Sequence, residues 1–238
     1  MAADAARRFA SEGAAVFVIA KDQGECENLD LPFAVADLRD EDATVNAFAS
    51  AQAALHRIDA LYAVAGGSGR RLGDGPLHEL SLAAWEGTFA MNATPPFLAA
   101  REALRMMLDQ EPGESGTRGS LVLMSSVLAY VPAPSLFATH AYAAAKAATI
   151  GMARAMAAYY ASHGIRVNAV APSLVTTPMS GRAAADPESV AFAQQRQPLS
   201  SGFLDVSDVT EIAVYLCSDE SRAMTGQVLA VDGGWSVT

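Results

Sequence analysis

A tyrosine and a lysine four residues apart carry the clearest chemical signal in this sequence. Tyr142 and Lys146 lie in an alanine-rich run, residues 141–148, and Ala is the strongest helix former. Side chains four residues apart share one face of a helix, so the phenol and the amine are expected to point into one cavity. A nearby positive charge lowers the pKa of a tyrosine, and such a phenol can exchange a proton with an alcohol or ketone oxygen near neutral pH. The alternative is that the two residues share a helix by chance. The chain has only two lysines against fourteen arginines, so lysine is not its usual cation, and this favours a functional pair.

The composition describes one domain, residues 1–238, that buries a substantial core. Hydrophobic residues make up 51% of the chain and charged residues 18%, which excludes a disordered segment. A net charge of -10 and the lack of a basic run argue against a nucleic-acid surface, and no apolar stretch is long enough to span a bilayer. Cys26 and Cys217 are unpatterned, so neither a disulfide framework nor a metal site is expected, and the protein is predicted to be cytoplasmic.

The elements that must position this pair alternate along the chain. Helices are expected at residues 2–11, 41–56, 81–92, 95–109, 140–163 and 206–217. Short Val, Ile, Ala and Leu runs predict strands at residues 15–20, 32–36, 58–65, 120–124, 165–170 and 228–231. Residues 177–204 look irregular and polar with short helical patches, as in a mobile flap. This alternation predicts an α/β fold, a doubly wound parallel sheet with helices on both faces.

Further residues fall at the ends of these elements. Asn92 ends a predicted helix, Ser125 and Ser126 end a predicted strand, and the chain closes on Thr225-Gly226 and Asp232-Gly233-Gly234. Together with the Tyr/Lys pair, they make the chain resemble the short-chain dehydrogenase/reductase family from its first helix to its C-terminus. The resemblance implies a Rossmann-like fold, a nicotinamide cofactor and a dimer or tetramer.

The resemblance also implies a catalytic tetrad. Tyr142 is the general acid and base, and Lys146 lowers its pKa and holds the nicotinamide ribose. Ser126 hydrogen-bonds the substrate oxygen, and Asn92 orders a water that relays protons. Taken singly, Ser126 could cap a strand end and Asn92 could simply end a helix.

The resemblance also implies cofactor-binding residues, although the match to the family is weaker at these positions. Asp37 matches an adenine-contacting Asp, with helix capping as the alternative. Where the first strand here ends, an Asp would select NAD, but Ala20 is followed by Lys21, which favours the 2′-phosphate of NADP unless Lys21 is merely solvated. The remaining carried-over positions are Ala65 and Gly66, beside the adenosine, and Pro172, Val175 and Thr177, around the nicotinamide.

The main departure from the family pattern lies at the start of the sequence. The family's first strand and its Thr-Gly-x-x-x-Gly-x-Gly turn, which holds the cofactor pyrophosphate, have no counterpart before the helix that starts at Met1. A central strand is then lacking, so either residues 16–19 pair directly with residues 61–64 or residues outside this sequence fill the slot. A misplaced start codon or a shortened chain explains the departure as well as a natural loss does. Two further departures are Ala63-Val64, where the family has Asn-Asn, and Ser173, where it has Gly.

Three functions follow from these observations. The leading one is an NADP- or NAD-dependent oxidoreductase acting on a ketone and alcohol pair. Because the phosphate-binding turn is lacking, a second is a cofactor-free isomerase, lyase or cyclase, and a third is a non-catalytic subunit paired with a complete paralogue. The pocket residues Val127, Leu128, Tyr130, Leu136 and Phe137 indicate a hydrophobic or aromatic small-molecule substrate.

Overall fold

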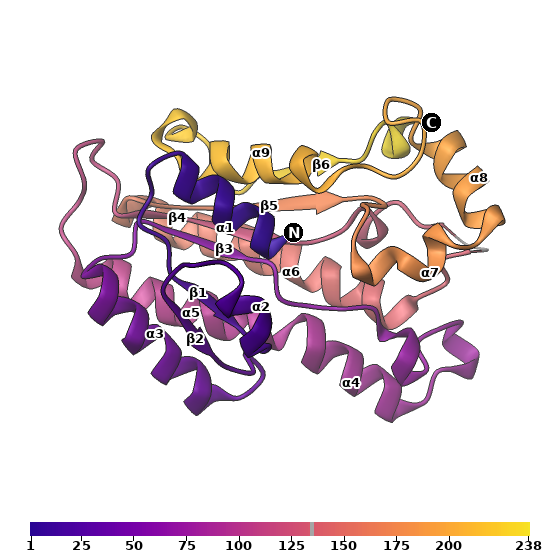
Figure 1. Ribbon diagram of the computed structural model, residues 1–238, viewed down its shortest axis with the longest axis horizontal. Coiled ribbons are helices and arrows are strands. Elements are labelled where there is room, and N and C mark those ends of the chain that lie inside the picture. The colour runs from indigo at the N-terminus through magenta and orange to yellow at the C-terminus, as the bar shows by residue number, and fades with distance from the viewer. Residues whose placement is uncertain (134–135) are drawn as a thin grey trace.

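The computed structural model describes residues 1–133 and 136–238 and has a three-layered α/β architecture. Parallel strands form the middle layer (Figure 1). The helices α1 (Ala2–Ser11) and α9 (Val206–Cys217) cover one face of it, and α3 (Glu41–Leu55), α4 (Leu82–Asn92), α5 (Thr94–Asp109) and α6 (His140–Tyr160) cover the other. The predicted fold class is therefore confirmed.

The strands form two separate parallel sheets. β1 (Val18–Ala20) pairs with β2 (Phe33–Val35), and the second sheet has the order β3 (Ala60–Ala63), β4 (Gly119–Met124), β5 (Ile165–Pro172) and β6 (Val228–Val231). No hydrogen-bonded ladder joins β1 to β3 in the part of the chain that the structure describes. The alternative in which residues 16–19 pair directly with residues 61–64 is therefore wrong, and the division lies where the sequence was expected to lack a strand.

Buried strands at the centre of the larger sheet anchor the fold. Every residue of β4 and β5 is buried, as expected for parallel strands that helices cover on both faces. One apolar core lies between this sheet and the α3–α5–α6 layer, and a second lies under α9. α1 is fixed to α9 by a 2.8 Å hydrogen bond from the Thr210 hydroxyl to Asp4 and by the Arg8–Glu211 ion pair.

The observed elements differ from the predicted ones mainly in two places. The sequence pattern missed α2 (Gln23–Glu27), a short helix capped by Asp22, whose side chain accepts from the N–H of Glu25. Residues 177–204, predicted to be irregular with short helical patches, contain α7 (Gly181–Ala184) and the ten-residue α8 (Pro187–Arg196). None of the helices in the described part of the chain has the length and apolar character of a membrane span.

Candidate active site

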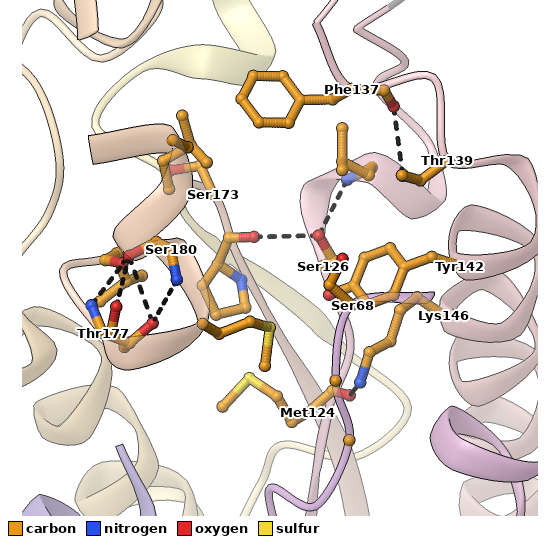
Figure 2. A pocket seen from close by; sticks show the side chains of 18 of the residues that line it. Ser68, Met124, Ser126, Phe137, Thr139, Tyr142, Lys146, Ser173, Thr177 and Ser180 are labelled. Atoms are coloured by element: carbon orange, nitrogen blue, oxygen red, sulfur yellow. Dashed lines mark hydrogen bonds between the residues drawn. The ribbon is translucent and has the colours of Figure 1, made fainter. Parts of the chain in front are cut away.

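A cavity of about 810 Å³ opens at the carboxyl ends of β3, β4 and β5. Loops that follow parallel strands meet at this edge of an open sheet, which is where such folds bind their ligands. Ser126, Tyr142 and Lys146 all line the cavity, so the structure brings these three predicted residues together. Figure 2 shows Tyr142 and Lys146 entering from α6, with Ser126 beside the phenol ring.

Ser126 is positioned by the short helical turn that follows β4. Its side chain is 7% exposed, and its hydroxyl oxygen accepts a hydrogen bond from the N–H of Leu128 at 3.3 Å. The hydroxyl also lies 3.5 Å from the carbonyl oxygen of Pro172. A second serine fixes the helix opposite, because the Ser125 hydroxyl donates to the carbonyl oxygen of Lys146 at 2.9 Å. The end of β4 and the helix α6 are therefore tied together directly at this point.

Lys146 is buried, with 3% of its surface exposed, and no carboxylate pairs with it in the described residues. Its Nζ donates to the carbonyl oxygen of Met124 at 2.9 Å and lies 5.7 Å from the centre of the Tyr142 ring. Burial lowers the pKa of Lys146 from 10.5 to about 8, since the charged form loses its hydration. The ammonium is thus held at the site at a cost in folding free energy.

The shift in the pKa of Tyr142 differs from the sequence-based expectation. Burial raises the pKa of Tyr142, and the Ser126 side chain acts in the opposite direction. The expectation that a lowered tyrosine pKa would dominate is therefore wrong for this structure, because desolvation of the phenolate outweighs the other influences. A protonated phenol at neutral pH is suited to donate a proton, as ketone reduction requires.

Asn92 is fully buried at the last position of α4, and its amide is occupied by the backbone. Its Oδ1 accepts from the N–H of Gly67 at 3.0 Å, and its Nδ2 donates to the carbonyl oxygens of Gly67 and Thr88. Gly66 lies against both polar groups, because a Cβ there would approach Asn92 Oδ1 to 2.8 Å and Lys146 Nζ to 3.3 Å. Asn92 therefore holds the loop after β3 close to the lysine, and its role in a proton relay stays a prediction.

Asp74 is a site residue that the sequence analysis missed. It is 5% exposed in the loop after β3, and its carboxylate accepts hydrogen bonds from the N–H groups of Ala141 and Tyr142 at 3.0 and 2.9 Å. It thereby satisfies two donors in the first turn of α6 and complements the positive end of the helix. Its contacts are 67 and 68 positions away, so no local pattern could have revealed them.

Lys21 and Asp37 follow β1 and β2, and they meet at the carboxyl end of that pair. Lys21 Nζ forms a 3.0 Å ion pair with Asp37, and Arg39 forms a second, shorter one. The hydrogen bond from Arg39, with help from Lys21, holds the pKa of the Asp37 carboxyl well below its usual range. Arg39 was missed in the sequence, although its place two residues after Asp37 offered a signal. Lys21 and Arg39 thus share the Asp37 carboxylate at this edge.

The segment after β5 is brought to the cavity as the sequence predicted. Pro172, Val175 and Thr177 all line it, as does Gly66, whereas Ala65 is exposed and does not. Thr177 caps the next helical turn, because its side chain accepts from the N–H of Ser180 while the Ser180 hydroxyl accepts from the N–H of Thr177. In the described residues, no group of His, Cys, Asp and Glu could hold a metal ion. The cofactor roles of these residues stay predictions.

Comparison with known proteins identifies the family. A family model described as enoyl-(acyl carrier protein) reductase matches residues 1–236. Short-chain dehydrogenase reductase 3a of Arabidopsis thaliana is 31% identical over 99% of this chain and 90% of its own length. The chain belongs to the short-chain dehydrogenase/reductase family. Its relatives in that family are named dehydrogenases, and it is an oxidoreductase of the same type.

Other short-chain dehydrogenase/reductase relatives vary in their named substrates. Inactive 2-(S)-hydroxypropyl-CoM dehydrogenase 2 of Xanthobacter autotrophicus is 37% identical over 84% of this chain and 82% of its own length. Cis-4-hydroxycyclohexanecarboxylate dehydrogenase of Sinomonas cyclohexanicum is 34% identical over 84% of this chain and 74% of its own length. A short-chain type dehydrogenase/reductase from Mycobacterium ulcerans has a similar structure, with a TM-score of 0.87 and 25% identity over 97% of this chain and 84% of that chain.

Proposed function

We propose that this chain interconverts a ketone and a secondary alcohol with NADP or NAD, using Tyr142, Lys146, Ser126 and Asn92. The observation that carries the proposal is the meeting of Tyr142, Lys146 and Ser126 in one cavity at the carboxyl ends of β3, β4 and β5. A phenol, an ammonium and a hydroxyl at one point can bind a carbonyl oxygen and move a proton to it.

In the reductive direction, the Tyr142 phenol donates its proton to the substrate oxygen, which becomes the alcohol hydroxyl. The Ser126 hydroxyl donates a hydrogen bond to the same oxygen and stabilises the negative charge that develops there. Lys146 supplies a positive charge near the phenolate that remains. A bound nicotinamide would supply the hydride in this direction and accept it in the other. Asn92 holds Gly66 and Gly67 against the lysine and positions a water that returns a proton to the site.

The residues present fit two parts of a nicotinamide cofactor. Lys146 and the segment Pro172–Thr177 would hold the nicotinamide and its ribose, and Gly66, which lines the same cavity, packs against Asn92 and Lys146 without a side chain. The cations Lys21 and Arg39, beside Asp37, would meet the adenosine end, and they favour NADP over NAD. The sequence contains no Thr-Gly-x-x-x-Gly-x-Gly turn for the pyrophosphate, so we expect weak cofactor binding by these 238 residues.

A second candidate is a cofactor-free isomerase, lyase or cyclase that uses the same phenol and hydroxyl. It needs only the phenol and the hydroxyl that line the cavity, since proton transfer alone requires no hydride. A non-catalytic subunit bound to a complete paralogue is the third candidate, and a homodimer or homotetramer is expected in the other two cases. The apolar lining residues Leu128 and Phe137 support a substrate with a hydrophobic or aromatic body.

Fluorescence titration with NADPH and NADH separates these candidates. The proposed function predicts binding of both, with tighter binding of NADPH, and ketone reduction that Tyr142→Phe removes. Turnover that is indifferent to added nicotinamide but still lost in Tyr142→Phe would select the cofactor-free enzyme. No binding and no turnover, in a chain that is poorly folded alone, would select the partner subunit.

A further inference from the structure

The charge of the cavity is opposite to the charge of the protein. The chain carries 26 acidic residues and 16 Lys and Arg residues, for a net charge of -10. Nevertheless, none of the described residues that line the cavity is an Asp or a Glu. The charged residues in the lining are all cations: Arg70, Arg71, Lys146 and Arg182. A concave site lined by one sign of charge concentrates ligands of the other sign.

Arg70 is fixed at the cavity by the backbone. It lies in the helical turn after β3, is half-buried, and donates a hydrogen bond through Nη2 to the carbonyl oxygen of Leu136. Burial is the main cause that lowers its pKa, and the charge of Arg182 lowers it further. A guanidinium carries five N–H donors in a rigid planar fork, so this single bond leaves most of them available to a ligand.

Arg182 lines the same cavity but comes from a distant part of the sequence. It lies on α7, more than a hundred positions after Arg70, and is exposed. In the described residues, neither arginine forms an ion pair, although the chain has many surplus carboxylates. Two like charges that approach each other without a counter-ion are unfavourable, and an anion bound between them would reverse that.

Two acids act on the arginines by their charge, but neither forms an ion pair with them in the described residues. Asp74 acts on Arg70, while its two oxygens accept from the N–H groups of Ala141 and Tyr142. Asp186 acts on Arg182, while its carboxylate accepts from the N–H and the hydroxyl of Ser189. Two further polar groups of the cavity lining, Ser173 Oγ and Trp235 Nε1, are buried without a hydrogen-bond partner. Both can donate a hydrogen bond, and buried donors are rarely left unpaired in folded proteins. Figure 2 shows Ser173 and Phe137 beside the space next to Ser126.

We propose that Arg70 and Arg182 bind the oxyanion of an acidic substrate, so that the enzyme acts on a hydroxy acid and its oxo acid. The apolar body of this substrate packs against Leu128 and Phe137, while its hydroxyl or carbonyl oxygen reaches Ser126 and Tyr142. Carboxylate, sulfonate and phosphate each present two oxygen atoms on one central atom, and these can accept the paired N–H groups of a guanidinium fork. This substrate class rests on the proposed oxidoreductase function, but the binding of the anion does not require turnover.

The test compares a charged probe with its neutral ester. Isothermal calorimetry measures the affinity of the protein for 4-acetylbenzoate and for methyl 4-acetylbenzoate, with the cofactor present as oxidised NADP so that neither ketone is reduced during the titration. The proposal predicts that the carboxylate binds at least about tenfold more tightly than the ester. Arg182→Gln should reduce that preference. The double variant Arg70→Lys/Arg182→Gln should abolish it. Arg222→Gln, an exposed arginine outside the cavity lining, removes the same charge and should keep the preference.

Three outcomes decide between the proposals. Equal affinities for the two probes, or no binding of either at millimolar concentration, overturn the anion site whether or not the ketones are reduced. A carboxylate preference without any reduction supports the anion site and counts against the oxidoreductase. A loss of NADPH affinity in Arg182→Gln that matches the loss of carboxylate affinity also overturns the substrate assignment, because the arginines then hold the phosphates of the cofactor.

Discussion

The carboxylate of Asp74 accepts a 2.9 Å hydrogen bond from the backbone N–H of Tyr142, although the two residues are 68 positions apart. The loop after β3 therefore fixes the first turn of the helix that carries the phenol. The same loop carries Gly66, which packs against Lys146, and Arg70, which lines the cavity. The loop after β3 thus positions Gly66, Arg70 and the first turn of α6 together.

Asp74→Asn tests this connection. The amide can accept only one of the two N–H groups and lacks the charge that favours a helix N-terminus, so we expect a loss of about 1–2 kcal/mol in unfolding free energy. The displaced phenol should also lower kcat more than it raises KM. Asp40→Asn is the matched control, because Asp40 caps α3 through the N–H of Ala43 at 2.9 Å. It should lose little stability, because Asn caps helices about as well as Asp, and should retain kcat; equal kcat losses in both variants would count against a positioning role for Asp74.

Replacement of Tyr142 by Phe removes the proton donor and preserves the ring. We expect kcat/KM for ketone reduction to fall about a thousandfold, within the usual range for general acid catalysis. Because burial raises the pKa of Tyr142, the phenol stays protonated above neutral pH, and any fall in the wild-type reduction rate should be centred near pH 8, where Lys146 loses its proton. Alcohol oxidation needs the phenolate and should rise above neutral pH. A pH–rate profile in both directions measures this, and a reduction rate already halved at pH 7 would contradict it.

Lys146→Met replaces the buried amine with an uncharged side chain. The variant should be inactive. It should also be more stable near neutral pH, because a pKa lowered from 10.5 to about 8 corresponds to a desolvation penalty of about 3 kcal/mol for the buried charge. The unfolded chain keeps this proton up to about pH 10, so the unfolding free energy of the wild type should rise between pH 8 and pH 10. Urea denaturation at several pH values should show this rise in the wild type, but not in Lys146→Met.

Gly66→Ala tests the close approach beside Asn92 and Lys146. The added methyl would come within 2.8 Å of Asn92 Oδ1, so the amide must move and its bonds to Gly67 must weaken. We expect a tenfold or greater loss of kcat/KM, since misplacement by about 1 Å can cost a hundredfold. Gly151→Ala is the control, because nothing lies within 4 Å of its Cβ position on α6 and alanine favours a helix. It should be as active as the wild type and slightly more stable.

The cofactor preference can be tested at the carboxyl ends of β1 and β2. The double variant Lys21→Ala/Arg39→Ala removes two cations from this edge, and we expect NADPH affinity to fall about tenfold more than NADH affinity. Arg57→Ala is a matched control, since Arg57 pairs with Asp59 two residues away, as Arg39 does with Asp37. Fluorescence titration gives both affinities, and equal losses for the two cofactors would exclude recognition of the 2′-phosphate here.

Sequence patterns anticipated much of the fold, because alternation of buried strands and amphipathic helices is a local property. α1, α9 and β6 have the predicted bounds, and the meeting of Ser126 with Tyr142 and Lys146 followed from the family motif. Contacts formed through tertiary packing could not be predicted. Neither the Asp74 bonds to α6 nor the approach of Arg182 to Arg70 leaves a periodic signal. The direction of the Tyr142 pKa shift depends on burial, which no sequence spacing measures.

The divided sheet has a consequence for the behaviour of the protein at high concentration. β1 and β3 each have one side without a strand partner in the described chain, and their residues carry neither a charge nor a proline. Folded proteins usually protect such sides with very short strands, lysine, proline or a bulge, because unpaired N–H and C=O groups can capture a strand from another molecule. Because β1 and β3 are only three and four residues long, a captured strand would form few hydrogen bonds with either. Light scattering should therefore show no growth in particle size as samples are concentrated.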